Sequence, residues 1–170
     1  MDAFPTAEEL ARFGISAPWW FAIRHRIRWS ECDPFGHANH RAYLEWFEEA
    51  RNRYLEGLGL PTLSAATPGP VIAEAHIRFH RPLSYAEEIL VTARTLRLGR
   101  TSFEMEYAAW REAPRDAALR GNPGRDGLAA IGTAVLILLV NATGEKALIP
   151  ATLRASILAR ERELREEAPR

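Results

Sequence analysis

The sequence is poor in cysteine, in net charge and in long apolar runs. Cys32 is the single cysteine among 170 residues, which excludes a disulfide framework within one chain and fits a reducing compartment. The 22 basic and 22 acidic residues cancel, so no field of one sign favours nucleic acid as a partner. The longest apolar run, near 129–140, is shorter than the ~20 residues of a membrane helix. The acidic, mixed N-terminus does not resemble a signal peptide. We therefore expect a cytoplasmic protein without membrane insertion.

The composition is that of an ordinary globular chain, with 47% hydrophobic and 26% charged residues. A chain of 170 residues can bury a core in one domain. The sequence predicts a main domain over 21–150 and an N-terminal extension over 1–20 that contains a short helix near 6–13. It also predicts a charged C-terminal helix within 151–170, reaching residue 166, with a thin apolar stripe of Leu153, Ile157 and Leu164.

Hydrophobic alternation predicts the strands of the main domain. They are expected at about 21–29, 71–80, 88–97, 102–111 and 128–140. In the first strand, Trp29 falls on the apolar face; in the second, one face holds Val71, Ala73, Ala75, Ile77 and Phe79. Loops are expected at 60–70 and 112–127.

One long amphipathic helix is predicted over 40–57. Its apolar stripe holds Tyr43, Phe47, Ala50, Tyr54 and Leu58, widened by Leu44 and Leu55. Asn39 is a suitable N-cap, and Gly57, Gly59 and Pro61 end the helix. Consecutive strands joined by short loops favour an antiparallel sheet, and the helix must cover one of its faces. The predicted class is therefore α+β.

The segment 28–53 concentrates the candidate chemistry. Asp33 follows a strand at a turn, and the helix begins seven residues later. A helix N-terminus has free backbone N–H groups and a partial positive charge, which can stabilise an oxyanion. A nearby carboxylate can activate water or attack a carbonyl itself, and Gly36 lets the loop bend closely around a ligand. These residues are compatible with an acyl-transfer site.

The same segment resembles the signature of the 4-hydroxybenzoyl-CoA thioesterase family of the hot-dog superfamily. The matching residues are Glu31-Cys32-Asp33, Gly36, Asn39-His40, Tyr43-Leu44 and Ala50-Arg51. Two later stretches are also similar to the family pattern: Phe79-His80-Arg81-Pro82-Leu83 and Gly99-Arg100-Thr101-Ser102. Glu31 stands where the family usually has Asp, and Asn39 and His40 fit two different branches. The resemblance covers about 21–150, with the loop at 112–127 as an insertion.

The resemblance implies a five-stranded antiparallel sheet wrapped around the long helix, and hydrolysis of an acyl-CoA thioester. By position, Asp33 is the nucleophile or general base, the His40 backbone N–H is the oxyanion donor, and Asn39 shapes the helix N-terminus.

Coenzyme A is part of the substrate that the resemblance implies, so no separate cofactor is expected. The expected substrate contacts are Gly36, His37, Tyr43, Arg81, Arg100 and Ser102, with the arginines binding phosphates. The family site forms between two units, which implies a homodimer or homotetramer.

Other interpretations remain open beside this one. Asp33 before Pro34 also suits an ordinary turn, and Asn39 an ordinary cap. Cys32 is a possible thiol nucleophile, although a buried, inert cysteine is the preferred interpretation. The five histidines form no familiar metal-ligand set, so no metal is expected. The competing functions are a hot-dog dehydratase or hydratase, whose usual His pattern is absent, a non-catalytic acyl-CoA-binding module, and a thioesterase that releases a carrier-protein-bound polyketide-type chain.

Overall fold

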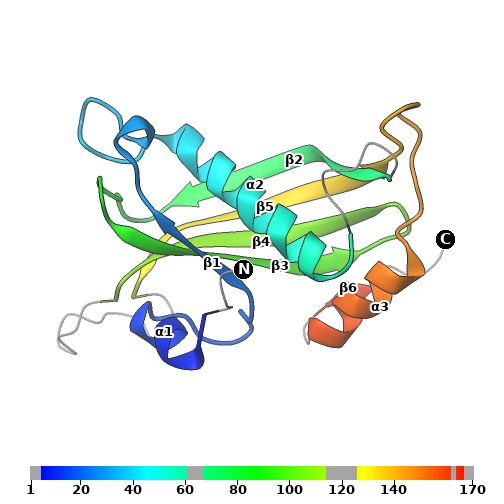
Figure 1. The fold of residues 1–170 in the computed structure, drawn as a ribbon, viewed down its shortest axis with the longest axis horizontal. Helices are drawn as coiled ribbons and strands as arrows, with labels where there is room; N and C mark the ends of the chain where they lie inside the picture. Colours follow the sequence, from blue (N-terminus) through cyan, green and yellow to red (C-terminus); the bar gives the residue numbers. More distant parts are fainter. Residues whose placement is uncertain (1–4, 61–66, 114–125, 162–163, 167–170) are drawn as a thin grey trace.

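A computed structural model describes residues 5–60, 67–113, 126–161 and 164–166. The main body is a curved sheet whose strands lie in the order β1-β3-β4-β5-β2, and all of these neighbours are antiparallel (Figure 1). The strands are β1 Ala22–Arg26, β2 Gly69–Phe79, β3 Glu88–Leu98, β4 Ser102–Arg111 and β5 Leu128–Leu139. The predicted α+β class with five antiparallel strands is confirmed.

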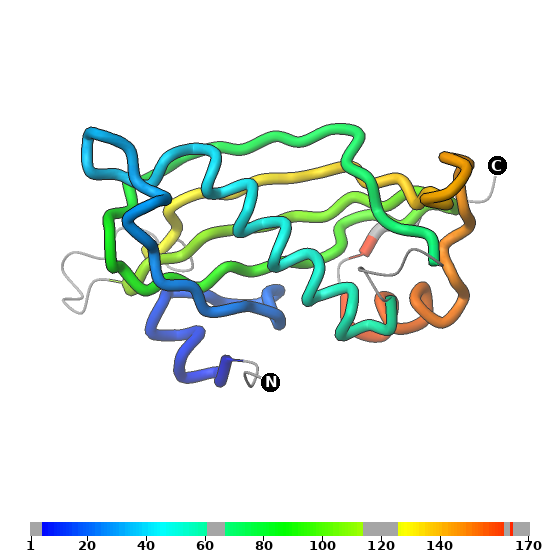
Figure 2. Tube along the Cα trace, turned by 45° about the horizontal axis from the view of Figure 1, so that its top comes forward, coloured from blue at the N-terminus to red at the C-terminus, as the bar shows by residue number. Residues whose placement is uncertain are grey.

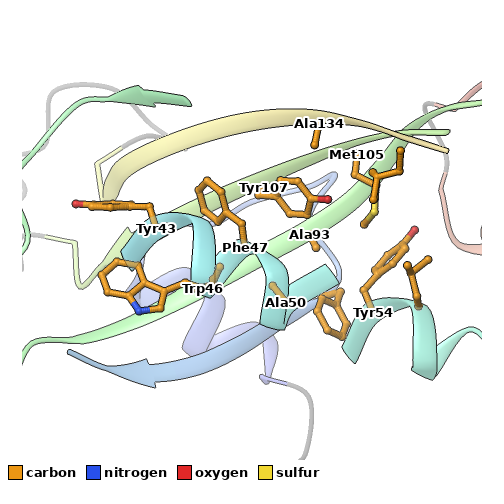
Figure 3. Close-up of a cluster of buried hydrophobic side chains, with 14 of the residues drawn as sticks. Tyr43, Trp46, Phe47, Ala50, Tyr54, Ala93, Met105, Tyr107 and Ala134 are labelled. Atoms are coloured by element: carbon orange, nitrogen blue, oxygen red, sulfur yellow. The ribbon is translucent and has the colours of Figure 1, made fainter. Parts of the chain in front are cut away.

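The long helix α2, His40–Gly57, lies across one face of the sheet (Figures 1 and 2). Its aromatic side chains point into the sheet (Figure 3), and Phe47 stacks on Tyr107 with ring centroids 5.3 Å apart. The predicted stripe is buried, and Tyr54 is completely covered. Burial of such large side chains contributes several kcal/mol each, which fixes the helix on the sheet. Leu44 is an exception, because it is 47% exposed on the helix flank.

For two of the predicted strands, the assignment of side chains to the apolar face was wrong. β1 ends at Arg26 and a short 3-10 helix follows at Trp29–Glu31, so the alternation stops before Trp29. Trp29 is therefore 74% exposed and contacts Tyr85 instead of the core. In β2, the register shifts between Ile72 and Glu74, which places Val71 and Ala75 on opposite faces of the sheet.

The opposite face of the sheet is covered at one end by the N-terminal segment. The short helix α1, Ala7–Arg12, ends in a chain that packs Phe13 and Ile15 against outward-facing residues of the strands. These partners are Ala22, Leu90, Ala108, Trp110 and Leu128. The predicted N-terminal helix is thus present, and it contributes a second, smaller apolar cluster to the same body.

The C-terminal helix is shorter than predicted. The helix α3, Ala151–Arg160, buries Leu153 and Ile157 but ends before Glu161. The Glu161 carboxylate accepts hydrogen bonds from Trp20 Nε1 at 3.1 Å, the Tyr54 hydroxyl at 2.6 Å and the Thr95 N–H at 3.1 Å. The backbone of Glu161 is extended, with φ −95° and ψ 104°, so the helix ends there. Residues Arg165–Glu166 then form a strand, β6, parallel to β3. The predicted loop at 112–127 lies largely outside the described residues, as does 61–66 of the loop at 60–70.

Candidate active site

The turn that carries Asp33 is closed by its own hydrogen bonds. The Asp33 N–H donates to the His37 carbonyl at 2.8 Å, and the Gly36 N–H donates to the Asp33 carbonyl at 3.0 Å. Gly36 has φ +82°, a conformation that favours glycine. The Asp33 Oδ1 accepts from the Phe35 N–H at 2.9 Å and the His37 N–H at 3.4 Å. Its Oδ2 accepts no hydrogen bond from the described residues, so this oxygen is available to a ligand.

The helix α2 begins directly after this turn with a side-chain cap. Asn39 Oδ1 accepts from the Arg41 N–H at 3.1 Å, which confirms Asn39 as the N-cap. The Asn39 carbonyl accepts from the Ala42 N–H at 2.9 Å. The His40 N–H has no partner in the part of the chain that the structure describes. A free, positively polarised donor therefore lies at the helix start, where it can bind a carbonyl oxygen or an oxyanion.

A cavity of about 410 Å³ lies between the turn, the start of α2 and the end of β2. It brings together Asp33, His37, His40, Tyr43 and Arg81, five of the residues predicted from sequence, together with Ala38 and Pro82. It also includes Phe79 and His80, which the sequence prediction missed as site residues. The stretch 79–83 resembles the family pattern and could have indicated both residues, but only Arg81 was assigned a role from it. Asn39 and Gly36 do not line the cavity, but they shape its walls through the cap and the turn.

Arg100 and Ser102 lie far from this cavity within the same chain. Ser102 pairs with Ile137 of β5, whereas the cavity residue Phe79 pairs with Ala130. Seven residues of an extended strand separate these two positions on β5, a distance of ~23 Å. Arg100 follows β3 at the same remote end, where its carbonyl accepts from the Ile149 N–H at 2.9 Å. A single chain therefore does not bring Arg100 and Ser102 to the cavity beside Asp33.

The fold and the site correspond to a known family. Residues 27–157 match the thioesterase-like superfamily. The chain belongs to this superfamily. It is 32% identical over 96 residues to a 1,4-dihydroxy-2-naphthoyl-CoA hydrolase of Rippkaea orientalis, an alignment that covers 55% of this chain and 70% of that protein.

Two solved structures of the superfamily support the assignment. A thioesterase superfamily protein from Jannaschia sp. is 30% identical with a TM-score of 0.78, over 95% of this chain and 97% of the other. A Thermus thermophilus thioesterase, crystallised with coenzyme A and Zn, is 29% identical with a TM-score of 0.65, over 82% and 92%. The chain therefore has the hot-dog fold of the thioesterases and is a thioester hydrolase.

Two side chains of this thioesterase, Tyr43 and Cys32, have raised pKa values. Burial, with a smaller contribution from the charge of Glu87, raises the pKa of Tyr43 to about 12. Its hydroxyl therefore stays protonated at neutral pH and can donate a hydrogen bond into the cavity. Desolvation and the charges of Glu31 and Asp33 raise the pKa of Cys32. Cys32 is half-buried, not fully buried as predicted, but its raised pKa opposes the thiolate that a nucleophile requires.

The described residues hold no group of three or more His, Cys, Asp or Glu side chains that could bind a metal ion. His76, one of the histidines considered for a metal, pairs with Glu74 at 2.7 Å instead. None of the helices in the described ranges has the length and hydropathy of a membrane span.

Proposed function

We propose that this protein hydrolyses an acyl-CoA to a free carboxylic acid and coenzyme A. The observation that carries the proposal is the cavity lined by Asp33 and His40: among the described residues, one Asp33 carboxylate oxygen and the His40 N–H at the helix start have no hydrogen-bond partner. The names of two relatives support coenzyme A as the carrier, since one is a CoA hydrolase and the other was crystallised with coenzyme A.

The catalytic roles follow from where charge develops during the reaction. The thioester carbonyl accepts a hydrogen bond from the His40 N–H, which stabilises the oxyanion as the tetrahedral intermediate forms. Asp33 either attacks the carbonyl carbon, so that the C–S bond breaks, coenzyme A leaves as a thiolate and water then hydrolyses the acyl anhydride, or it removes a proton from an attacking water and passes it to the departing thiolate as the C–S bond breaks. The histidines and Arg81 around the cavity provide donors for the phosphates of coenzyme A, and Tyr43 with Phe79 forms an aromatic wall, with ring centroids 5.0 Å apart, against the acyl group.

The assay for this function is thiol release from a panel of acyl-CoAs with short, long and aromatic acyl groups. We expect steady turnover of at least one class, at kcat values between about 1 and 10³ s⁻¹. Matched carrier-protein thioesters form the second arm of the panel. Cleavage of the carrier-linked chains alone would assign the carrier-releasing reaction instead. Saturable binding of acyl-CoA without cleavage would assign a non-catalytic acyl-CoA-binding protein.

We further propose that the chain works as a homodimer joined through β2. This strand pairs with β5 on one side and has no neighbouring strand on the other side in the part of the chain described. Its side chains Val71, Ile72 and Phe79 are 46%, 41% and 50% exposed, and Leu44 of α2 is exposed as well. Unpaired, apolar edge strands tend to pair with another chain. A two-fold axis beside β2 brings the strand end near Ser102 of one copy toward the cavity of the other.

A charge on the edge strand tests this dimer. We expect Ile72→Asp to shift the protein from dimer to monomer in size-exclusion chromatography with light scattering, because a charge would replace an apolar side chain on the edge that the dimer buries. Leu158→Asp on α3 is the control, since Leu158 is also 41% exposed but lies away from β2, and it should leave the dimer intact. An Ile72→Asp protein that remains dimeric at micromolar concentration would contradict the β2 interface.

A further inference from the structure

Glu31 is a buried carboxylate beside the catalytic turn, and it contacts three different elements. Its Oε2 accepts from the Arg28 N–H at 2.6 Å and lies 3.0 Å from His25 Nε2 of β1. Its Oε1 accepts from Trp46 Nε1 of α2 at 3.0 Å. The residue is 7% exposed. One side chain therefore joins the first strand, the turn that follows it and the second turn of the long helix.

The backbone of the same segment is bonded to the start of α2. The Glu31 carbonyl accepts from the Asn39 N–H at 2.8 Å, and the Ser30 carbonyl accepts from Arg41 Nη2 at 2.9 Å. Two residues further along the chain, Asp33 begins its hydrogen-bonded turn. The segment of Glu31 thus links the turn of Asp33 to the start of α2, and the reaction requires the Asp33 carboxylate and the His40 N–H at a fixed separation.

We propose that Glu31 is a positioning residue, which holds the turn of Asp33 in register with the oxyanion donor at the N-terminus of α2. The inference rests on the function proposed above for this site. Glu31 does not line the cavity, so it acts through the turn and the helix and not on the substrate. Misplacement of reacting groups by about 1 Å lowers rates by about 10²-fold, so a rigid link at this place has a direct effect on turnover.

The charge state of Glu31 is consistent with this role. Burial opposes its ionisation, but the hydrogen bonds from Arg28, Trp46 and His25 outweigh the burial and lower the pKa of the carboxyl. Glu31 is therefore a carboxylate at neutral pH, an acceptor without a proton of its own. The Arg28 N–H and the Trp46 indole N–H are obligate donors, and the carboxylate accepts one of them on each of its oxygens.

The chain offers a matched control at its other end. Glu161 is buried to a similar degree, at 6% exposed. Like Glu31, it accepts from a tryptophan indole, Trp20 Nε1, and from a backbone N–H, that of Thr95. Its third partner is Tyr54, which lies fourteen residues along α2 from His40, a distance of ~21 Å. Glu31→Gln and Glu161→Gln therefore make the same chemical change at similar depth, and only the first lies beside the catalytic turn.

The experiment compares kcat, KM and melting temperature of the two variants with those of the unmodified protein. We expect Glu31→Gln to lower kcat by roughly 10- to 100-fold with KM within about threefold. Glu161→Gln is expected to lose thermal stability to a similar extent but to keep kcat within about twofold. Glu31→Asp, which keeps the charge on a shorter side chain, should recover part of the lost kcat. Equal losses of kcat in both glutamine variants, or a loss in Glu31→Gln that appears only in KM, would overturn the proposal.

Amide hydrogen exchange separates this proposal from the proposed function. The Asn39 and His37 N–H groups, which bond to Glu31 and Asp33, should exchange at least about fivefold faster in Glu31→Gln than in Glu161→Gln. The Arg154 N–H of α3 is the reference amide in both. Faster exchange at these two sites supports the positioning role even if no acyl-CoA is cleaved, in which case only the proposed function fails. Unchanged exchange at both sites overturns the positioning role.

Discussion

Replacing Asp33 by asparagine is expected to lower kcat by about 10³-fold, a larger effect than that expected of Glu31→Gln. Asparagine keeps the size of the side chain and an oxygen for the Phe35 N–H, so the turn is preserved. It removes the negative charge, and with it both possible roles of Asp33, attack on the carbonyl and removal of a proton from water. KM is expected to stay within a few fold, because the contacts that bind coenzyme A are unchanged.

The measurement is thiol release by the Asp33→Asn protein on the best acyl-CoA of the panel, with circular dichroism to confirm the fold. Cys32→Ala is the matched control, since Cys32 is the neighbouring residue and its raised pKa disfavours a nucleophilic thiolate. This variant should keep kcat within about threefold. An active Asp33→Asn protein together with an inactive Cys32→Ala protein would transfer the catalytic role from the carboxylate to the thiol.

Substituting Gly127 by alanine is expected to lower the free energy of unfolding by about 3 kcal/mol, the upper end of the loss that an added methyl group causes in a packed site. A Cβ atom at this position would lie 2.1 Å from the Phe13 carbonyl oxygen and 2.4 Å from that of Arg111. Both contacts are with backbone, so no side chain can rotate away to relieve them. The N-terminal segment that carries Phe13 must then move off the sheet, or β4 must shift.

Thermal denaturation measures this effect, and a loss of about 3 kcal/mol corresponds to roughly 6–12 °C in a domain of this size. Gly57→Ala is the control, because a Cβ there meets nothing within 4 Å and the residue lies in the last turn of α2. Alanine has the better helix propensity, so Gly57→Ala should leave stability unchanged or raise it by up to about 1 kcal/mol. A Gly127→Ala protein with an unchanged melting temperature would mean that the N-terminal segment does not pack on the sheet as described.

The helix α2 shows how much a local pattern can predict. Its predicted bounds, its N-cap Asn39 and its buried stripe all match the structure, because caps, glycine ends and helical periodicity act within a few residues. β4 likewise occupies the predicted 102–111. The pattern failed at Leu44, which has the right spacing for the core but is 47% exposed on a helix flank that no element within the described ranges covers.

The sequence predicted only part of the candidate site, again because a local pattern does not show which distant segments meet. Asp33, His37, His40 and Tyr43 lie within one short segment, so the sequence motif indicates them together. Phe79 and His80 reach the same cavity from the end of β2, a strand distant in sequence, and alternation alone does not reveal which strand end meets the helix. Arg100 and Ser102 were expected in the site, and within one chain the sheet register places them at the opposite end of the sheet, so their role in a site shared by two copies stays a prediction.

The α+β class, the long helix and the Asp33 turn before the helix start are predictable from the sequence, because each depends on interactions between residues close in the chain. Three features became visible only in the folded chain: the contacts of Glu31 with His25 and Trp46, the end of α3 at Glu161, and the wall of the cavity formed by the end of β2. These features join elements far apart in sequence, and their geometry depends on strand register and helix packing that no local pattern encodes. Asp33 therefore follows from the motif, whereas the groups that hold it in place follow from the fold.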